Sequence, residues 1–220
     1  QYNISPETYV GVETKGMSVE NMLNQQLNLD WAKGKNVAIS ANGAMFKRDK
    51  QGFLPELMEK MYTERVVYKK KAIEAKIEYQ KTKDPIYSNE ISRCHNIQMA
   101  KKISLNSAYG AIGNQYFRYF DVKQAEAITL GGQLSIRWVE RDVNRFMNKL
   151  LGTDNKNYVV ASDTDSIYLK LDTLVEKVCK DKSTKQIVDF LNKAAEEKIQ
   201  KVIDDSYQNL ANYVNAYQQK

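Results

Sequence analysis

Proline constrains the fold of this chain more than any other residue, because it breaks helices and interrupts sheets. The 220 residues contain only three prolines, and none lies between Pro55 and Pro85. Only ten glycines occur. Long helices are therefore permitted, whereas the many turns of a β-sandwich are disfavoured. The length predicts one domain or two closely packed ones.

Composition and charge narrow the class of protein. Hydrophobic residues make up 42% of the chain and charged residues 27%, which excludes a disordered polymer. The net charge of +6 hints at an anionic partner. Cys94 and Cys179 lie far apart without metal-ligand spacing, so we expect reduced thiols and a cytoplasmic location. No apolar run approaches the ~20 residues of a membrane span, and no signal peptide is visible.

The first half of the chain combines turns with two helices. Asn42-Gly43 lies between the apolar runs 37–39 and 44–46, which predicts a β-hairpin near residues 37–46. From Pro55 the pattern becomes helical and continues to the break at Asp84-Pro85. We expect a second helix, capped by Ser88 and Glu90, that runs to about residue 110. Together they predict an antiparallel helical hairpin.

The second half predicts helices around a second β-hairpin. Apolar residues recur at helical spacing in 116–152, and Gly152 can end that helix. The β-rich runs 158–162 and 166–171 flank a short acidic turn, and we expect their strands to be buried. From Ser183 to the end the chain is amphipathic. The expected fold class is α+β, with packed helices, an antiparallel sheet that carries the acidic hairpin, and a helical-hairpin subdomain.

The acidic turn Asp163-Thr164-Asp165-Ser166 is the sharpest chemical feature. Two carboxylates at the end of a buried hairpin repel each other unless a cation neutralises them. Magnesium accepts a few carboxylate oxygens and shares substrate phosphates, so the turn predicts a metal site at Asp163 and Asp165. The alternative is a turn without a ligand, because Asp is a favoured turn residue.

Basic residues of the helical hairpin form the second feature. Lys102, Asn106 and Tyr109 stand at helical spacing, which presents a phosphate-binding charge and an aromatic ring on one face. Arg65 and Lys69 are four residues apart on the preceding helix, and with Lys102 they could cradle a triphosphate. Residues 56–110 hold 11 basic and 7 acidic residues, which places +4 of the net charge there. The alternative is a pair of solvated helix faces.

These motifs resemble the palm-and-fingers region of family B DNA polymerases, most closely those of T-even-like tailed bacteriophages. The segment Lys102–Gly110 resembles the fingers-helix motif, the segment Asp163–Ser166 the palm metal motif, and Arg65 with Lys69 a triphosphate-contacting pair. The likeness extends through 3–8, 117–121 and 138–141, and covers most of the chain.

The resemblance implies a role for each matched residue. Asp165 would be a ligand of two catalytic Mg²⁺ ions, with Asp163 as a supporting acid. Arg65, Lys69 and Lys102 would bind the triphosphate of a dNTP, and Lys102 would also assist proton transfer to the leaving pyrophosphate. Asn106 would position the nucleotide, and Tyr109 would lie beneath the nascent base pair. The palm would comprise residues 1–54 and 111–220, and the fingers residues 55–110.

The resemblance also implies parts that these 220 residues do not contain. The family carries a second metal-binding aspartate and an exonuclease before this region, and a thumb after it. We therefore expect the isolated chain to be inactive, and to copy a DNA primer–template only with a partner chain or further segments. Two alternatives remain open: a non-catalytic nucleic-acid-binding remnant, and a reverse-transcriptase-like palm, against which the Lys102–Gly110 motif argues.

Overall fold

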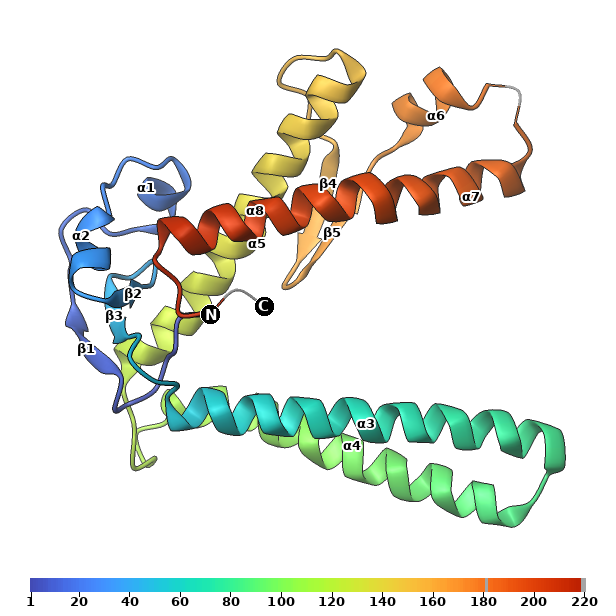
Figure 1. Cartoon of the computed structure of the whole chain (residues 1–220), viewed down its shortest axis with the longest axis horizontal. Coiled ribbons are helices and arrows are strands. Elements are labelled where there is room, and N and C mark those ends of the chain that lie inside the picture. The colour runs from blue at the N-terminus through green and yellow to red at the C-terminus, as the bar shows by residue number, and fades with distance from the viewer. Residues whose placement is uncertain (181, 219–220) are drawn as a thin grey trace.

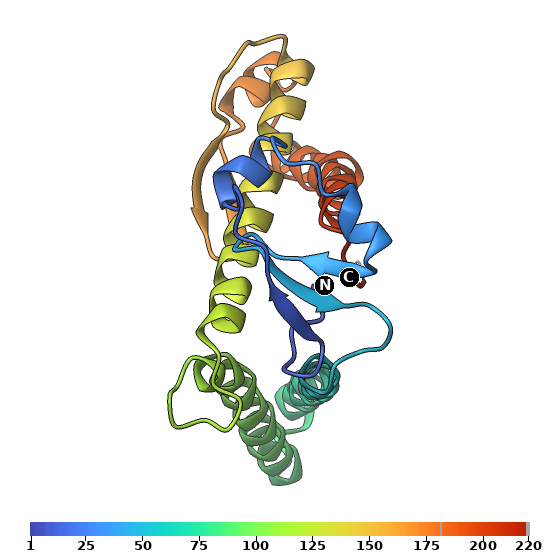
Figure 2. The ribbon, with the colours of Figure 1, turned by 90° about the vertical axis from the view of Figure 1, so that its left-hand side faces the viewer.

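The computed structural model describes residues 1–180 and 182–218, which form a helix-rich body and a long projecting helical hairpin (Figure 1). A view turned by 90° keeps the hairpin at one end of the body (Figure 2). The expected α+β class is confirmed. Among the described residues, no helix is both long enough and apolar enough to cross a bilayer. The helices and strands are β1 (Tyr9–Val12), α1 (Val19–Leu23), α2 (Asp30–Gly34), β2 (Val37–Ile39), β3 (Ala44–Lys47), α3 (Phe53–Thr82), α4 (Pro85–Ile112), α5 (Val122–Leu151), β4 (Val159–Asp163), β5 (Ser166–Leu169), α6 (Asp172–Val178), α7 (Thr184–Ala194), the π-helix η1 (Ala195–Ile199) and α8 (Gln200–Tyr213).

The N-terminal sheet is antiparallel and has the strand order β1-β3-β2. Its β2–β3 hairpin is the one predicted from Asn42-Gly43, with Val37 opposite Lys47 and Ile39 opposite Met45. Gly43 has φ +83°, and a Cβ there would lie 1.8 Å from the Glu13 carbonyl oxygen, so only glycine fits. The third strand, β1, was not predicted.

The predicted helical hairpin is confirmed, although its second helix begins earlier than expected. Helix α4 starts at Pro85 rather than near Ser88, because Asp84 accepts a hydrogen bond from the Ile86 amide at 2.9 Å. Proline suits this first turn, since it has no N–H to leave unpaired. Between the helices, Lys83 ends α3 in the left-handed conformation, with φ +59°.

Helix α5 is the central element of the body. It begins at Val122, later than the predicted 116, because the Asp121 side chain caps the amides of Lys123 and Gln124. It ends at Gly152 in the left-handed conformation, as expected. Trp138 is 1% exposed and stacks on Tyr213 of α8, with the ring centroids 5.5 Å apart.

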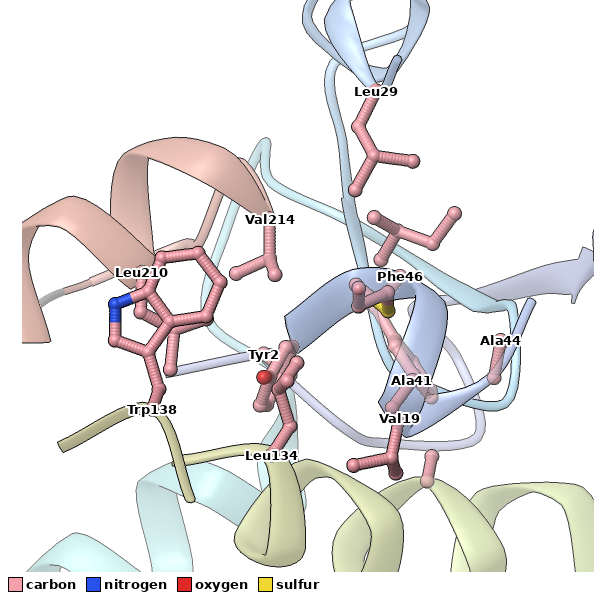
Figure 3. Close-up of a cluster of buried hydrophobic side chains, with 13 residues drawn as sticks. Tyr2, Val19, Leu29, Ala41, Ala44, Phe46, Leu134, Trp138, Leu210 and Val214 are labelled. Carbon is pink, nitrogen blue, oxygen red and sulfur yellow. The ribbon is translucent and has the colours of Figure 1, made fainter. Parts of the chain in front are cut away.

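Two hydrophobic clusters share the buried face of α5. The first joins its N-terminal half to the three-stranded sheet, to α1 and to α8, and includes Leu134 and Trp138 (Figure 3). The second joins its C-terminal half to β4, β5 and α8, and includes Val143, Met147 and Tyr158. The body is thus built on one long helix with a separate core at each half.

Candidate functional site

The acidic turn lies at the free end of the two-stranded β4–β5 hairpin. Asp163 ends β4 opposite Ser166, and Thr164 takes φ +53°. The Asp165 amide donates a hydrogen bond to the Asp163 carbonyl oxygen at 2.6 Å, which closes the turn. Both ribbon views direct this turn toward the α3–α4 hairpin (Figures 1 and 2).

The expected burial of this hairpin is wrong. Both aspartates are exposed, and so are Val160 at 62% and Tyr168 at 58%. The reason is that a two-stranded sheet has one face on the body and leaves the other to solvent. On the covered face, Ile167 and Leu169 pack against the second hydrophobic cluster, as does Tyr207 of α8. Burial raises the pKa of Tyr207, and the nearby Asp165 carboxylate raises it further.

Local hydroxyl groups are the only hydrogen-bond partners of the two carboxylates within 1–180 and 182–218. Thr164 donates to Asp163 at 3.0 Å, and Ser166 donates to Asp165 at 3.4 Å. Neither carboxylate forms an ion pair in that part of the chain. The same residues contain no group of three or more His, Cys, Asp or Glu side chains that could hold a metal ion. The oxygen donors suit Mg²⁺ in type, but two carboxylates do not complete its ligand set.

The predicted cations occupy one side of the α3–α4 hairpin. Glu64 and Lys101 form an ion pair across the seam between the helices, and this contact lowers the pKa of Glu64. Arg65 and Lys102 directly follow these two residues, and each is rotated by about 100° about its helix axis. Because the two helices are antiparallel, both rotations lead to the same side of the hairpin. Arg65 and Lys102 therefore project from one side, together with Lys69 one turn along α3.

The three predicted cations lack acidic partners. Among the residues that the structure describes, Arg65, Lys69 and Lys102 form no ion pair, whereas the adjacent Lys101 does. The Nε atom of Arg65 is buried and has no hydrogen-bond partner there. A buried donor without a partner costs free energy, so an anion that reached this guanidinium would be stabilised. The predicted three-cation arrangement stays a proposal, since no contact joins the three.

Asn106 and Tyr109 lie closer to the body on α4. Asn106 is exposed, and Tyr109 is 47% exposed. The Tyr109 hydroxyl is 2.8 Å from Thr129 Oγ1 of α5, which ties the ring to the body. Sequence reasoning missed Thr129, because this contact joins two helices that share no motif.

A cavity of about 440 Å³ lies where the hairpin meets the body. Tyr109, Leu105 and Met58 line it from the hairpin, and Gly132 lines it from α5. Sequence reasoning missed this cavity as well. The adjacent glycines at 131 and 132 were its one signal, since glycine within a helix often marks a close approach. A Cβ at residue 131 would lie 2.9 Å from the Tyr2 ring.

The structure brings the predicted residues together in two groups and leaves the groups apart. The carboxylates belong to the body, and the cations belong to the hairpin. Asn106 and Tyr109 lie on the same helix as Lys102, nearer the body. No hydrogen bond or ion pair links the two groups within the described parts of the chain. The arrangement thus places carboxylates on the body and cations on the hairpin.

Comparison with known proteins identifies the family. A model of DNA polymerase family B matches residues 1–211. The DNA-directed DNA polymerases of Enterobacteria phage T4 and Escherichia phage RB69 are each 29% identical to this chain over 259 aligned residues, covering 98% of it and 28% of their own length. DNA polymerase 1 of Pyrococcus abyssi is 30% identical over 172 residues, covering 78% of this chain and 20% of its own length. The chain thus spans less than a third of these relatives, and it belongs to DNA polymerase family B.

Proposed function

We propose that this chain is the palm and fingers portion of a template-directed DNA polymerase, which adds dNTPs to the 3′ end of a primer. Residues 1–54 and 111–220 would form the palm, and residues 55–110 the fingers. One observation supports the proposal in a chain of this family. The two carboxylates of the body and the three cations of the hairpin have no charged partner among the described residues.

Arg65, Lys69 and Lys102 bind the triphosphate of the incoming nucleotide in this proposal. Their charges offset those of the phosphates, and the buried Nε of Arg65 gains the acceptor that it lacks within the described chain. Lys102 also assists proton transfer to the leaving pyrophosphate. Asn106 positions the nucleotide, and Tyr109, held by Thr129, supports the nascent base pair.

Asp165 and Asp163 hold the catalytic magnesium ions in the proposed mechanism. Bound Mg²⁺ would neutralise charge on the attacking and leaving oxygens. The exposed turn presents carboxylate oxygens for this purpose, while Thr164 and Ser166 orient them. Further ligands have to come from outside the described residues, since these supply no third acidic group. The partners are a DNA primer–template, dNTPs and the protein parts that complete the site, in the cytosol.

Nucleotide binding by the 220-residue chain tests this proposal. We expect dATP to bind more tightly with Mg²⁺ than with EDTA in isothermal titration calorimetry. Arg65→Ala should weaken binding by at least about tenfold, because it removes a charge-assisted hydrogen bond. Lys70→Ala, a control on the same helix but another face, should change affinity little. Asp165→Asn should abolish the Mg²⁺ effect, while the control Asp154→Asn should keep it.

Two outcomes would contradict the proposal. Nucleotide binding that is indifferent to Mg²⁺, to Asp165 and to Arg65 favours the non-catalytic, nucleic-acid-binding alternative. Robust primer extension by the chain alone would contradict the inference that its metal site is incomplete. We expect no extension from the chain alone.

A further inference from the structure

The cations of α3 continue past the proposed nucleotide site in a row. Arg65, Lys69, Lys76 and Lys83 are separated by four, seven and seven residues. At about 100° and 1.5 Å per residue, they fall within an arc of about 40° and extend over about 27 Å. The three lysines are exposed. Lys83, the C-cap residue of α3, holds its Nζ 5.5 Å from the centroid of the Tyr79 ring, so its ammonium group lies on the same side of the hairpin as that ring.

No acidic residue lies within the row between Arg65 and Lys83. The only acids between residues 65 and 83 are Glu74 and Glu78, and helical periodicity places both about 160° around α3 from the row. Glu78 pairs with Lys81 there, at 2.7 Å. On α4, Glu90 pairs with Arg93 at 2.6 Å. In the part of the chain that the structure describes, no member of the row forms an ion pair.

The row is longer than a bound nucleotide needs. Lys76 lies about 10 Å beyond Lys69 along the helix axis, and Lys83 about 21 Å beyond it. A triphosphate held by Arg65 and Lys69 would reach neither. An extended line of charge fits a linear polyanion, and the sugar-phosphate backbone of a nucleic acid is one.

An exposed aromatic ring at the edge of the row favours a single strand. Tyr62 stands one turn before Arg65 and is 57% exposed. Unpaired bases stack on such rings, whereas duplex bases are already stacked on each other. We propose that the Arg65–Lys83 row and Tyr62 form a binding surface for single-stranded DNA, with Lys76 and Lys83 on backbone phosphates. Only the choice of DNA as the polymer rests on the proposed function.

Salt-dependent binding of a labelled oligothymidylate to the 220-residue chain tests the surface, without nucleotide or Mg²⁺. Each phosphate contact with a single strand contributes about 0.7 to the slope of log affinity against log salt. Lys76→Gln with Lys83→Gln should therefore lower the slope by about 1.4. Affinity near 0.1 M salt should fall by about tenfold to thirtyfold.

A matched control distinguishes the contribution of this helix face to DNA binding from that of the net charge. Lys70→Gln with Lys81→Gln removes the same charge from the same helix, at least about 100° away from the row. We expect this pair to change the slope by less than about 0.5. Equal losses from both pairs would overturn the proposal, because binding would then follow net charge alone.

Tyr62→Ala adds a test that charge cannot imitate. Loss of base stacking should weaken binding at least about fivefold and leave the salt slope unchanged. No effect of Tyr62→Ala, or competition by polyglutamate as strong as by DNA of equal charge, would overturn the assignment to single-stranded DNA. Circular dichroism checks that each variant is folded. A failure here leaves the Arg65-dependent binding of dATP intact, so the two proposals fail separately.

Discussion

The body and the α3–α4 hairpin use apolar residues in different ways. Helix α5 of the body buries residues along its whole length, from Ala127 to Leu151. Helices α3 and α4, of similar length, bury only four residues: Leu54, Ala75, Cys94 and Ile112. Large side chains such as Ile86 are instead exposed on the hairpin. The body therefore has two cores, whereas the hairpin has one narrow seam.

The same two regions differ in charge. In the body, Arg141 lies between the Trp138 ring, at 4.1 Å, and the Asp142 carboxylate, at 3.0 Å. The hairpin instead carries the Arg65–Lys83 row of cations, none of which forms an ion pair among the described residues. The difference shows how the chain separates its tasks: buried contacts of the body hold the acidic turn in place, while the hairpin presents charge to solvent. A helix pair with a single seam is also the part that moves at the lowest cost.

Truncation of Trp138 should have the largest effect on stability. Trp138→Ala empties a packed site in the first core, and we expect it to lower the free energy of unfolding by about 3–5 kcal/mol. Urea titration followed by circular dichroism measures this. Ile86→Ala on the hairpin should change it by less than about 0.5 kcal/mol, because that side chain is 67% exposed. Similar losses at both sites would break the comparison.

Two glycine substitutions should act in opposite directions. Gly43→Ala puts a Cβ 1.8 Å from a backbone oxygen at φ +83°, and should destabilise the body by about 2–3 kcal/mol. Gly132→Ala, on α5, meets nothing within 4 Å and should stabilise by about 0.5–1 kcal/mol. Thermal and urea unfolding measure both. A stable Gly43→Ala variant would contradict the tight turn.

The Glu64–Lys101 ion pair tests how firmly the hairpin seam is held. A double-mutant cycle with Glu64→Gln and Lys101→Gln should give a coupling energy of about 0.5–1 kcal/mol, since the pair is partly exposed. The more exposed Lys81–Glu78 pair on the same hairpin should give about 0.2–0.5 kcal/mol. Equal couplings would mean that the seam adds nothing to the interaction.

Acid should produce the smallest effect, confined to the hairpin. Hydrogen bonds from Arg93, and then from Cys94, lower the pKa of Glu90 to about 2 from its usual 4.5. A lowered carboxyl pKa stabilises the folded state above pH 4.5, and this contribution is lost as the pH falls toward 2. The melting temperature of Glu90→Gln should therefore lie slightly below that of the natural chain at pH 7, and the difference should vanish near pH 2. If the difference in melting temperature persists near pH 2, it arises from packing and not from the charge of Glu90.

Local sequence signals were sufficient to predict turns and helix ends, because these depend on residues that are neighbours in the chain. The Asn42-Gly43 turn, the break at Asp84-Pro85 and the helix end at Gly152 are all found where expected. The start of α4 was misjudged because two cap signals competed, and Asp84, directly before a proline, was the stronger. Strand β1 was missed because its partner β3 lies more than thirty residues away, and no local pattern specifies that pairing.

The features of the candidate site likewise fall into those predicted from local sequence and those that depend on tertiary packing. Residue type and spacing singled out Asp163, Asp165, Arg65, Lys69, Lys102, Asn106 and Tyr109 as candidates, and the family resemblance gave each of them a role. The sequence also determined the secondary structure around them, because caps and turns depend on neighbouring residues. Only the tertiary structure decided that the acidic hairpin is exposed, that Tyr109 meets Thr129, and that the predicted cations form no ion pair among the described residues. Burial and contact depend on segments distant in the chain, so they arise only when those segments pack together.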